Sequence, residues 1–324
     1  MLTSARLFSR RAALWAAALV AAALIALPWV RDREHVTIDD DLRQRMRAQG
    51  HAFARLEAGT LHYELGGPSG APLVVLIHGV SGPMAVWDET VGPLREAGFR
   101  TLRVDHFGRG WSDRVDRDYD LDLFVGEVEQ ILADLGESGA VRLAGSSMGA
   151  IVAAELALRH ADRVDRVALI GPAGFPLKAT PLARLIQVPL VGDYIMRVAG
   201  DGSLADHNRR YFHEPERFQA FQRQFEEQLT VIGSKAAILS TMRSTPVQSY
   251  LDRYADLGRL GKPLLIVWGR EDRAFPYEHH EQALVAMPSA ELVTVDAAGH
   301  LPMLERPEKV SSRLVEFMSR STRR

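Results

Sequence analysis

The pentapeptide Gly145-Ser146-Ser147-Met148-Gly149 constrains the fold of this chain more than any other segment. An apolar run, residues 140–144, precedes it, and an amphipathic run, residues 150–160, follows it. The pattern predicts a strand, a sharp turn with G-x-S-x-G at its corner, and a helix. Such a turn strains the backbone of its central residue, and the small flanking glycines let the strand and the helix approach closely. The hydroxyl of Ser147 is then expected to stand clear of the sheet.

A serine hydroxyl becomes an effective nucleophile only when a base accepts its proton, and that base needs a carboxylate to fix its tautomer. Two loops in the C-terminal third supply such groups. Residues 262–269 form a predicted buried strand that ends shortly before Asp272, and residues 291–295 form the next one, which ends shortly before His300. Open α/β sheets place their sites at the carboxyl ends of neighbouring strands, so we expect Ser147, Asp272 and His300 to meet there.

Two further motifs complete the pattern. Residues 78–82 (HGVSG) follow a predicted strand at residues 73–77, and residues 105–112 (DHFGRGWS) follow a predicted strand at residues 100–104. With the serine turn and the two C-terminal loops in this order, the chain resembles the α/β-hydrolase-fold serine hydrolases. The resemblance implies an α/β fold with a mostly parallel, eight-stranded sheet flanked by helices, and a helical cap inserted after strand 6.

The same resemblance implies a role for each site residue. Ser147 is the expected nucleophile, His300 the base and Asp272 the carboxylate that orients it. The backbone N–H groups of Val80 and Met148 are the expected oxyanion hole. No metal or cofactor is expected, since the sequence contains no cysteine, no H-E-x-x-H motif, no P-loop and no G-x-G-x-x-G motif.

Neighbouring residues compete for these roles. Ser146 adjoins Ser147, but only the middle residue of the pentapeptide lies at the apex of the turn. Glu271 is an alternative to Asp272, although we expect it to face solvent. Asp296 precedes His300 and is expected to cap its turn.

Four other histidines need an explanation. His78 is expected to support the oxyanion loop rather than to act as a base. His106 is expected to be a turn histidine, with a substrate contact as the alternative. His279 and His280 are expected on the surface, because adjacent histidines on a helix are poorly placed to share a metal ion.

Strands and helices stop alternating between residues 171 and 261, where the sequence predicts mostly helix. We place the cap at residues 175–257, between two parts of the core at residues 53–174 and 258–324. Ligand pockets are mostly apolar, so apolar side chains of this region, with Ser81, are candidates for the pocket wall. They are Phe175, Leu177, Ile186, Met196, Phe212 and Met242.

The N-terminus differs from the rest of the chain. Residues 12–30 are uncharged and apolar, and three arginines precede them. A membrane anchor, a cleaved signal peptide with export of the rest, and a twin-arginine signal all fit this pattern. We favour a single-span anchor over residues 1–34, which makes the membrane a partner and places the main domain on the outer, periplasmic side. Residues 35–52 are then a connecting helix.

A formal net charge of −2 argues against nucleic acid as a partner. The resemblance favours hydrolysis of a small carboxylic ester with an apolar acyl or alcohol part, through an acyl-enzyme. Because a fold does not dictate a reaction, two alternatives stay open. One is a carbon–carbon bond hydrolase of ring-fission products, and the other is a non-catalytic ligand receptor that has kept the three residues.

Overall fold

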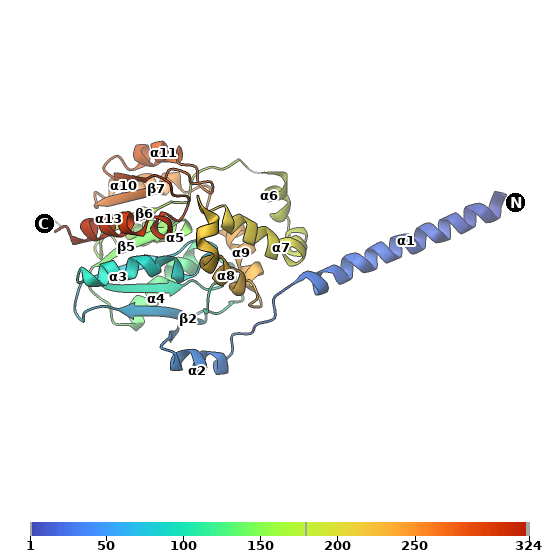
Figure 1. Ribbon diagram of the computed structural model, residues 1–324, viewed down its shortest axis with the longest axis horizontal. Coiled ribbons are helices and arrows are strands. Elements are labelled where there is room, and N and C mark those ends of the chain that lie inside the picture. The colour runs from blue at the N-terminus through green and yellow to red at the C-terminus, as the bar shows by residue number, and fades with distance from the viewer. Residues whose placement is uncertain (1, 179, 322–324) are drawn as a thin grey trace.

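A single eight-stranded sheet forms the centre of the molecule (Figure 1). The computed structural model describes residues 2–178 and 180–321, with the side chains of residues 2–14, 16 and 182 excepted. The strands follow the order β1-β2-β4-β3-β5-β6-β7-β8 across the sheet. They are β1 (Ala52–Arg55), β2 (Thr60–Gly66), β3 (Leu73–Ile77), β4 (Arg100–Asp105), β5 (Val141–Ser146), β6 (Val164–Ile170), β7 (Leu264–Gly269) and β8 (Glu291–Val295).

The pairing of the strands confirms the predicted fold class. β1 and β2 form an antiparallel hairpin, and β2 is also antiparallel to β4. From β4 to β8 every neighbouring pair is parallel. The carboxyl ends of β3 to β8 therefore meet along one edge of the sheet, where the predicted site residues follow.

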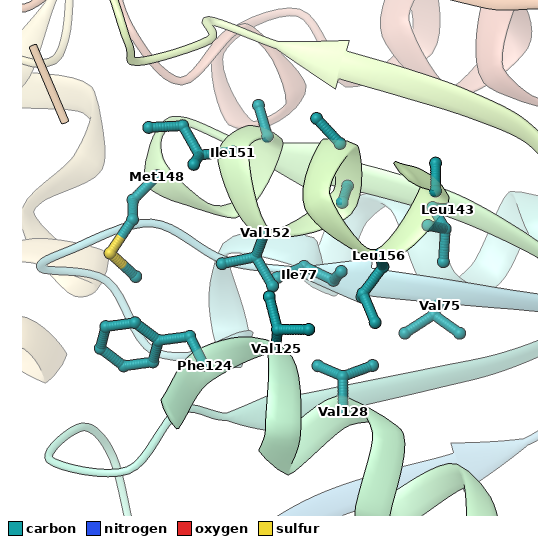
Figure 2. Close-up of a cluster of buried hydrophobic side chains, with 14 of the residues drawn as sticks. Val75, Ile77, Phe124, Val125, Val128, Leu143, Met148, Ile151, Val152 and Leu156 are labelled. Carbon is teal, nitrogen blue, oxygen red and sulfur yellow. The ribbon is translucent and has the colours of Figure 1, made fainter. Parts of the chain in front are cut away.

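Two buried clusters cover the two faces of the sheet. Successive strand residues point to opposite faces, so Val75 and Ile77 belong to one cluster and Val74 and Leu76 to the other. Figure 2 shows part of the first cluster, in which side chains of α5 and α4 meet those of β3 and β5. The helices of this face are α4 (Leu121–Asp134), α5 (Met148–Arg159), α10 (Leu251–Arg259) and α11 (His279–Ala286). On the other face lie the 3-10 helix η1 (Met84–Trp87), α3 (Asp88–Glu96), α12 (Pro302–Glu305) and α13 (Pro307–Ser319).

A long insertion, residues 171–263, separates β6 from β7 and is mostly helical. Most of it packs as a separate layer, in which Met196 of α7 meets Phe225 of α8 and Ile238 of α9. α10 differs, because its Tyr254 and Leu257 are buried in the core cluster under the sheet. The insertion comprises α6 (Pro181–Ile186), α7 (Val191–Arg209), η2 (Pro215–Phe218), α8 (Gln219–Gln228), α9 (Ser234–Ser244) and α10.

The N-terminal helix α1 (Leu2–Arg31) extends away from the rest of the molecule (Figure 1). Among the described residues, no helix combines the length and the apolar character that crossing a membrane requires. The predicted run began at residue 12, and its first residues lie outside the described side chains. The predicted membrane anchor is therefore wrong, and so are the membrane as partner and the outward-facing location.

The chain between α1 and the sheet is helical over a shorter stretch than predicted. α2 spans Asp40–Ala48. Asp39 caps its N-terminus, because the side chain of Asp39 accepts a hydrogen bond from the N–H of Leu42 at 2.8 Å. The residues before it are extended, because they bind the insertion. Val36 pairs with Val231, and the carboxylate of Glu34 accepts hydrogen bonds from the N–H groups of Gly233 and Lys235, both at 2.8 Å.

These contacts make Glu34 the N-terminal cap of α9, supplied from a distant part of the chain. We predict that Glu34→Ala lowers the free energy of unfolding by about 1–2 kcal/mol, because two amides at the start of α9 lose their acceptor. Urea unfolding measures this loss. Glu96→Ala, at an exposed position, is the matched control, and an equal loss in both variants would contradict the capping role.

Candidate active site

Ser147 occupies the turn between β5 and α5 with φ 56° and ψ −121°, a backbone conformation that residues other than glycine rarely adopt. The glycines on either side permit this turn. A Cβ on Gly145 would lie 2.1 Å from the carbonyl oxygen of Gly149, and a Cβ on Gly149 would lie 2.2 Å from the carbonyl oxygen of Ile77. Neither position accommodates a side chain, so β3, β5 and α5 meet closely only because both residues are glycine.

His300 and Asp272 lie together at the carboxyl ends of β8 and β7. Nδ1 of His300 is 2.8 Å from Oδ2 of Asp272, and both side chains are buried. The other carboxylate oxygen, Oδ1, accepts hydrogen bonds from the N–H groups of Ala274 and Phe275 at 2.8 and 2.9 Å. With one oxygen held by its own loop, Asp272 presents the other to the imidazole, which donates from Nδ1 and keeps Nε2 available as a base.

Further hydrogen bonds join the loop that follows β7 to the loop that follows β8. The N–H of Glu271 donates to the carbonyl of Ala298, and the N–H of Ala298 donates to the carboxylate of Glu271, both at 3.0 Å. Glu271 thus ties the two loops together rather than facing solvent as predicted. Asp296 pairs with Arg270 at the surface.

A small cavity of about 20 Å³ connects Ser147 and His300. No hydrogen bond joins the two side chains in the described structure, and in unliganded enzymes such bonds are often long until substrate binds. The cavity also contains the loop after β3 and residues of the insertion. Its lining consists of Gly79, Val80, Ser81, Gly82, Val86, Ser146, Ser147, Asn208, Tyr211, Phe221, His300 and Leu301.

The loop after β3 runs directly beside the serine, since a Cβ on Gly79 would lie 2.8 Å from Cβ of Ser147. The backbone N–H groups of Val80 and Met148 donate no hydrogen bond to any described residue. Val80 lines the cavity, and Met148 follows Ser147 directly in the chain. His78 holds the peptide that carries the Val80 N–H, because its Nδ1 donates to the carbonyl of Gly79 at 2.7 Å. This is the supporting role that the sequence predicted for His78.

A buried guanidinium lies behind this loop. Nε of Arg109 donates to the carbonyl of Val80 at 2.8 Å, and one terminal nitrogen donates to Oγ1 of Thr241 on α9 at 2.6 Å. Burial lowers the pKa of Arg109 to about 10, so the group remains charged at neutral pH. A fixed positive charge close to the loop favours negative charge developing on a ligand oxygen bound by the loop amides.

A second buried group supports the loop from below. His106 donates from Nε2 to the carbonyl of His78 at 3.1 Å, and its Nδ1 contacts the carboxyl of Glu127. Burial raises the pKa of Glu127 well above its usual value and lowers the pKa of His106 to about 3. The pair is therefore neutral, with protonated Glu127 donating to His106, and His106 makes no contact with the cavity.

We predict that Glu127→Gln stabilises the protein increasingly as the pH rises. In the unfolded chain Glu127 loses its proton near pH 4.5, whereas in the folded protein it stays protonated, so the wild type loses stability above that pH. Glutamine keeps a donor for His106 and an acceptor for the N–H of Phe107 but does not titrate. Urea unfolding at pH 5 and pH 8 measures the difference between the two proteins, which should grow by up to about 1.4 kcal/mol per pH unit. A difference independent of pH would contradict a protonated Glu127.

Of the residues predicted for the pocket wall, only Ser81 lines the described cavity. Phe175 is buried and stacks on Tyr254 and His279, which explains why His279 is half-buried rather than exposed. The others lie in hydrophobic clusters elsewhere, and a place for them in the wall of a wider cavity stays a prediction. Leu177 packs on the core, Phe212 stacks on Phe218, and Ile186, Met196 and Met242 lie in the cluster between α7, α8 and α9.

The sequence did not reveal three residues that reach the cavity from the insertion, namely Asn208, Tyr211 and Phe221. The Tyr211 hydroxyl lies 3.0 Å from Oγ of Ser81, and its ring centroid lies 4.8 Å from that of His300. No motif marks these positions, because they reach the site through the packing of helices and not through the ends of strands. Within residues 2–178 and 180–321, no group of three or more His, Asp or Glu side chains is arranged to hold a metal ion.

A parallel sheet with a serine turn after β5, and acidic and histidine loops after β7 and β8, defines a class of α/β enzymes. The chain belongs to the α/β-hydrolase family, whose model matches residues 74–313.

Individual relatives are distant but cover most of the chain. A 2-hydroxy-6-oxononadienedioate/2-hydroxy-6-oxononatrienedioate hydrolase from Paraburkholderia xenovorans is 27% identical over 82% of this chain and 94% of its own length. Among solved structures, an enol-lactonase from Burkholderia xenovorans aligns with a TM-score of 0.71 and 24% identity, over 83% of this chain and all of its own. An esterase from Exiguobacterium antarcticum aligns with a TM-score of 0.71 and 22% identity, over 83% of this chain and 99% of its own.

Proposed function

We propose that this hydrolase cleaves a carboxylic ester through Ser147, His300 and Asp272, with an acyl-enzyme intermediate. The observation that carries the proposal is that Ser147 and His300 share one cavity, while Asp272 binds the far side of the imidazole at 2.8 Å. The amides of Val80 and Met148, which have no hydrogen-bond partner among the described residues, would donate to an oxyanion formed at Ser147.

In the proposed mechanism, Nε2 of His300 accepts the proton of Ser147 as its oxygen attacks the ester carbonyl carbon. The carbonyl oxygen becomes an oxyanion and accepts hydrogen bonds from the amides of Val80 and Met148, with the charge of Arg109 behind them. His300 then protonates the leaving alcohol, and the acyl group stays on Ser147. Water, deprotonated by His300, attacks the acyl-enzyme, and the acid is released. Asp272 remains ionised throughout and stabilises the imidazolium.

We further infer that the insertion acts as a cap over this site, since Asn208, Tyr211 and Phe221 all reach the cavity from it. Val86, Phe221 and Leu301 give the cavity apolar sides. Apolar side chains in the cavity favour the binding of an ester whose acyl or alcohol part is largely apolar.

A carbon–carbon bond hydrolase is the second candidate. The relative from Paraburkholderia xenovorans supports it, because the dienedioate in its name carries hydroxy, oxo and carboxylate groups but no ester. A dicarboxylate substrate calls for cationic partners, and no arginine or lysine is present in the described lining of the cavity. This composition favours the ester.

We predict that a fluorophosphonate labels the wild type at Ser147 and leaves Ser147→Ala unlabelled. Loss of the nucleophile should lower ester turnover by at least about 10⁴-fold. Asp272→Asn should fold normally and lose turnover to a similar extent, because the imidazole then adopts the wrong tautomer. Mass spectrometry of the labelled peptide identifies the site, and Ser146→Ala is the control. Labelling that survives in Ser147→Ala would refute the assignment.

We predict that 4-nitrophenyl butyrate is hydrolysed with a burst of nitrophenol, while a 2-hydroxy-6-oxo-dienedioate is cleaved at least about tenfold less efficiently. The expected reason is the absence of a cationic partner for the carboxylates. Stopped-flow absorbance measures both reactions. A higher kcat/KM on the dienedioate would favour the carbon–carbon hydrolase, and saturable ligand binding without turnover of either compound would favour a receptor.

A further inference from the structure

The carboxamide of Asn208 is an unpaired polar group inside the candidate active site. Asn208 lies near the C-terminal end of α7, is 1% exposed and lines the cavity that contains Ser147 and His300. Neither its Oδ1 nor its Nδ2 has a hydrogen-bond partner among the described residues. Because nearly all buried polar side chains are hydrogen-bonded, an orphaned carboxamide at this place points to a bound partner.

The surroundings of Asn208 define the chemistry of that partner. A carboxamide donates from nitrogen and accepts at oxygen, so a hydroxyl group satisfies both atoms, whereas a carboxylate only accepts. The described lining holds no arginine, lysine, aspartate or glutamate, so no permanently charged side chain there pairs with a charged ligand. The partner is therefore neutral and hydroxyl-bearing.

The size of the cavity limits where that hydroxyl sits on the substrate. A volume of about 20 Å³ holds little more than one water-sized group, and Ser147 and Asn208 both border it. A group bound by Asn208 is then within one or two bonds of the carbonyl carbon that Ser147 attacks. Since the acyl part stays on Ser147 through both chemical steps, the hydroxyl belongs on the acyl side.

We propose that Asn208 is a specificity-determining residue that selects esters of 2-hydroxy acids. This inference rests on the ester hydrolysis proposed above and names the substrate class of the same site. The hydroxyl next to the ester carbonyl donates to Oδ1 of Asn208 and accepts from Nδ2.

Tyr211 and Ser81 both line the cavity and are hydrogen-bonded to each other, so an ester larger than one water-sized group needs the Tyr211 side chain to move aside. Tyr211 lies in the loop that follows α7, whereas Asn208 lies within the helix. A rotation of the Tyr211 side chain would widen the cavity beside Asn208, while the Tyr211 carbonyl keeps the hydrogen bond from the N–H of His300 at 2.6 Å.

The test compares two esters that differ by one hydroxyl group, 4-nitrophenyl 2-hydroxybutyrate and 4-nitrophenyl butyrate. The wild type should hydrolyse the hydroxy ester with a kcat/KM at least about tenfold higher, after correction for its faster uncatalysed hydrolysis, since a site built around a hydroxyl rejects the analogue that lacks it. Asn208→Leu should bring the ratio of kcat/KM for the two esters close to one, because the hydroxy ester loses the partner of its hydroxyl group. Ser203→Leu, at an exposed position of the same helix, is the control and should keep the preference.

Each other outcome has a defined meaning. A wild type without preference, or an Asn208→Leu variant that slows both esters equally, would overturn the inference and leave Asn208 as a structural residue hydrated by a single water. The ratio of kcat/KM for the two esters is measured on the wild type and needs no variant. If Asn208→Leu does not fold, Asn208→Asp is used in its place. If neither ester is hydrolysed and Ser147 is not labelled by a fluorophosphonate, the proposed function itself fails, and the inference fails with it.

Discussion

The candidate site depends on the close approach of three backbone segments. The end of β3, the end of β5 and the first turn of α5 meet where Gly145 and Gly149 leave no room for a Cβ. At this contact Ser147 adopts a positive φ and lines the cavity, and the Met148 amide follows it directly in the chain. The core cluster of α4, α5 and the sheet supports the strained turn, since the methyl and methylene groups shown in Figure 2 hold α5 in place from below.

A second layer of interactions orients the loop beside Ser147. His78 binds one peptide of this loop through the Gly79 carbonyl, and Arg109 binds the next through the Val80 carbonyl. Both side chains are buried and ordered by further hydrogen bonds, His78 by the backbone of His106 and Arg109 by Thr241. Preorganised amides of this kind cost no reorganisation when charge develops on a bound oxygen. The loop is therefore rigid for reasons that lie outside the cavity.

The sequence predicted those parts of the site that follow strands. Ser147, Asp272 and His300 each come shortly after a buried apolar run, and parallel strands bring such positions to one edge of the sheet. The sequence failed where packing between helices decides the outcome. Asn208 and Tyr211 reach the cavity through the packing of α7 against α8 and α9, and no periodicity encodes that placement. Residues 35 and 36 were predicted helical, yet both N–H groups bind the carbonyl of Thr230, and Val36 pairs with Val231. These partners lie almost 200 residues away, so the local pattern cannot reveal them.

The segment before α2 also matters for the interior of the molecule. Nζ of Lys235 is buried and binds the carboxylates of Asp32 and Asp201, while its backbone is held by Glu34. Lys235 lies in the first turn of α9, and Thr241 of the same helix accepts a hydrogen bond from Arg109. A shortened form of the chain starting at residue 40 would leave the ammonium with a single counter-ion and the start of α9 uncapped. Removing residues 1–39 would therefore disturb the helix that holds Arg109, whose guanidinium binds the loop beside Ser147.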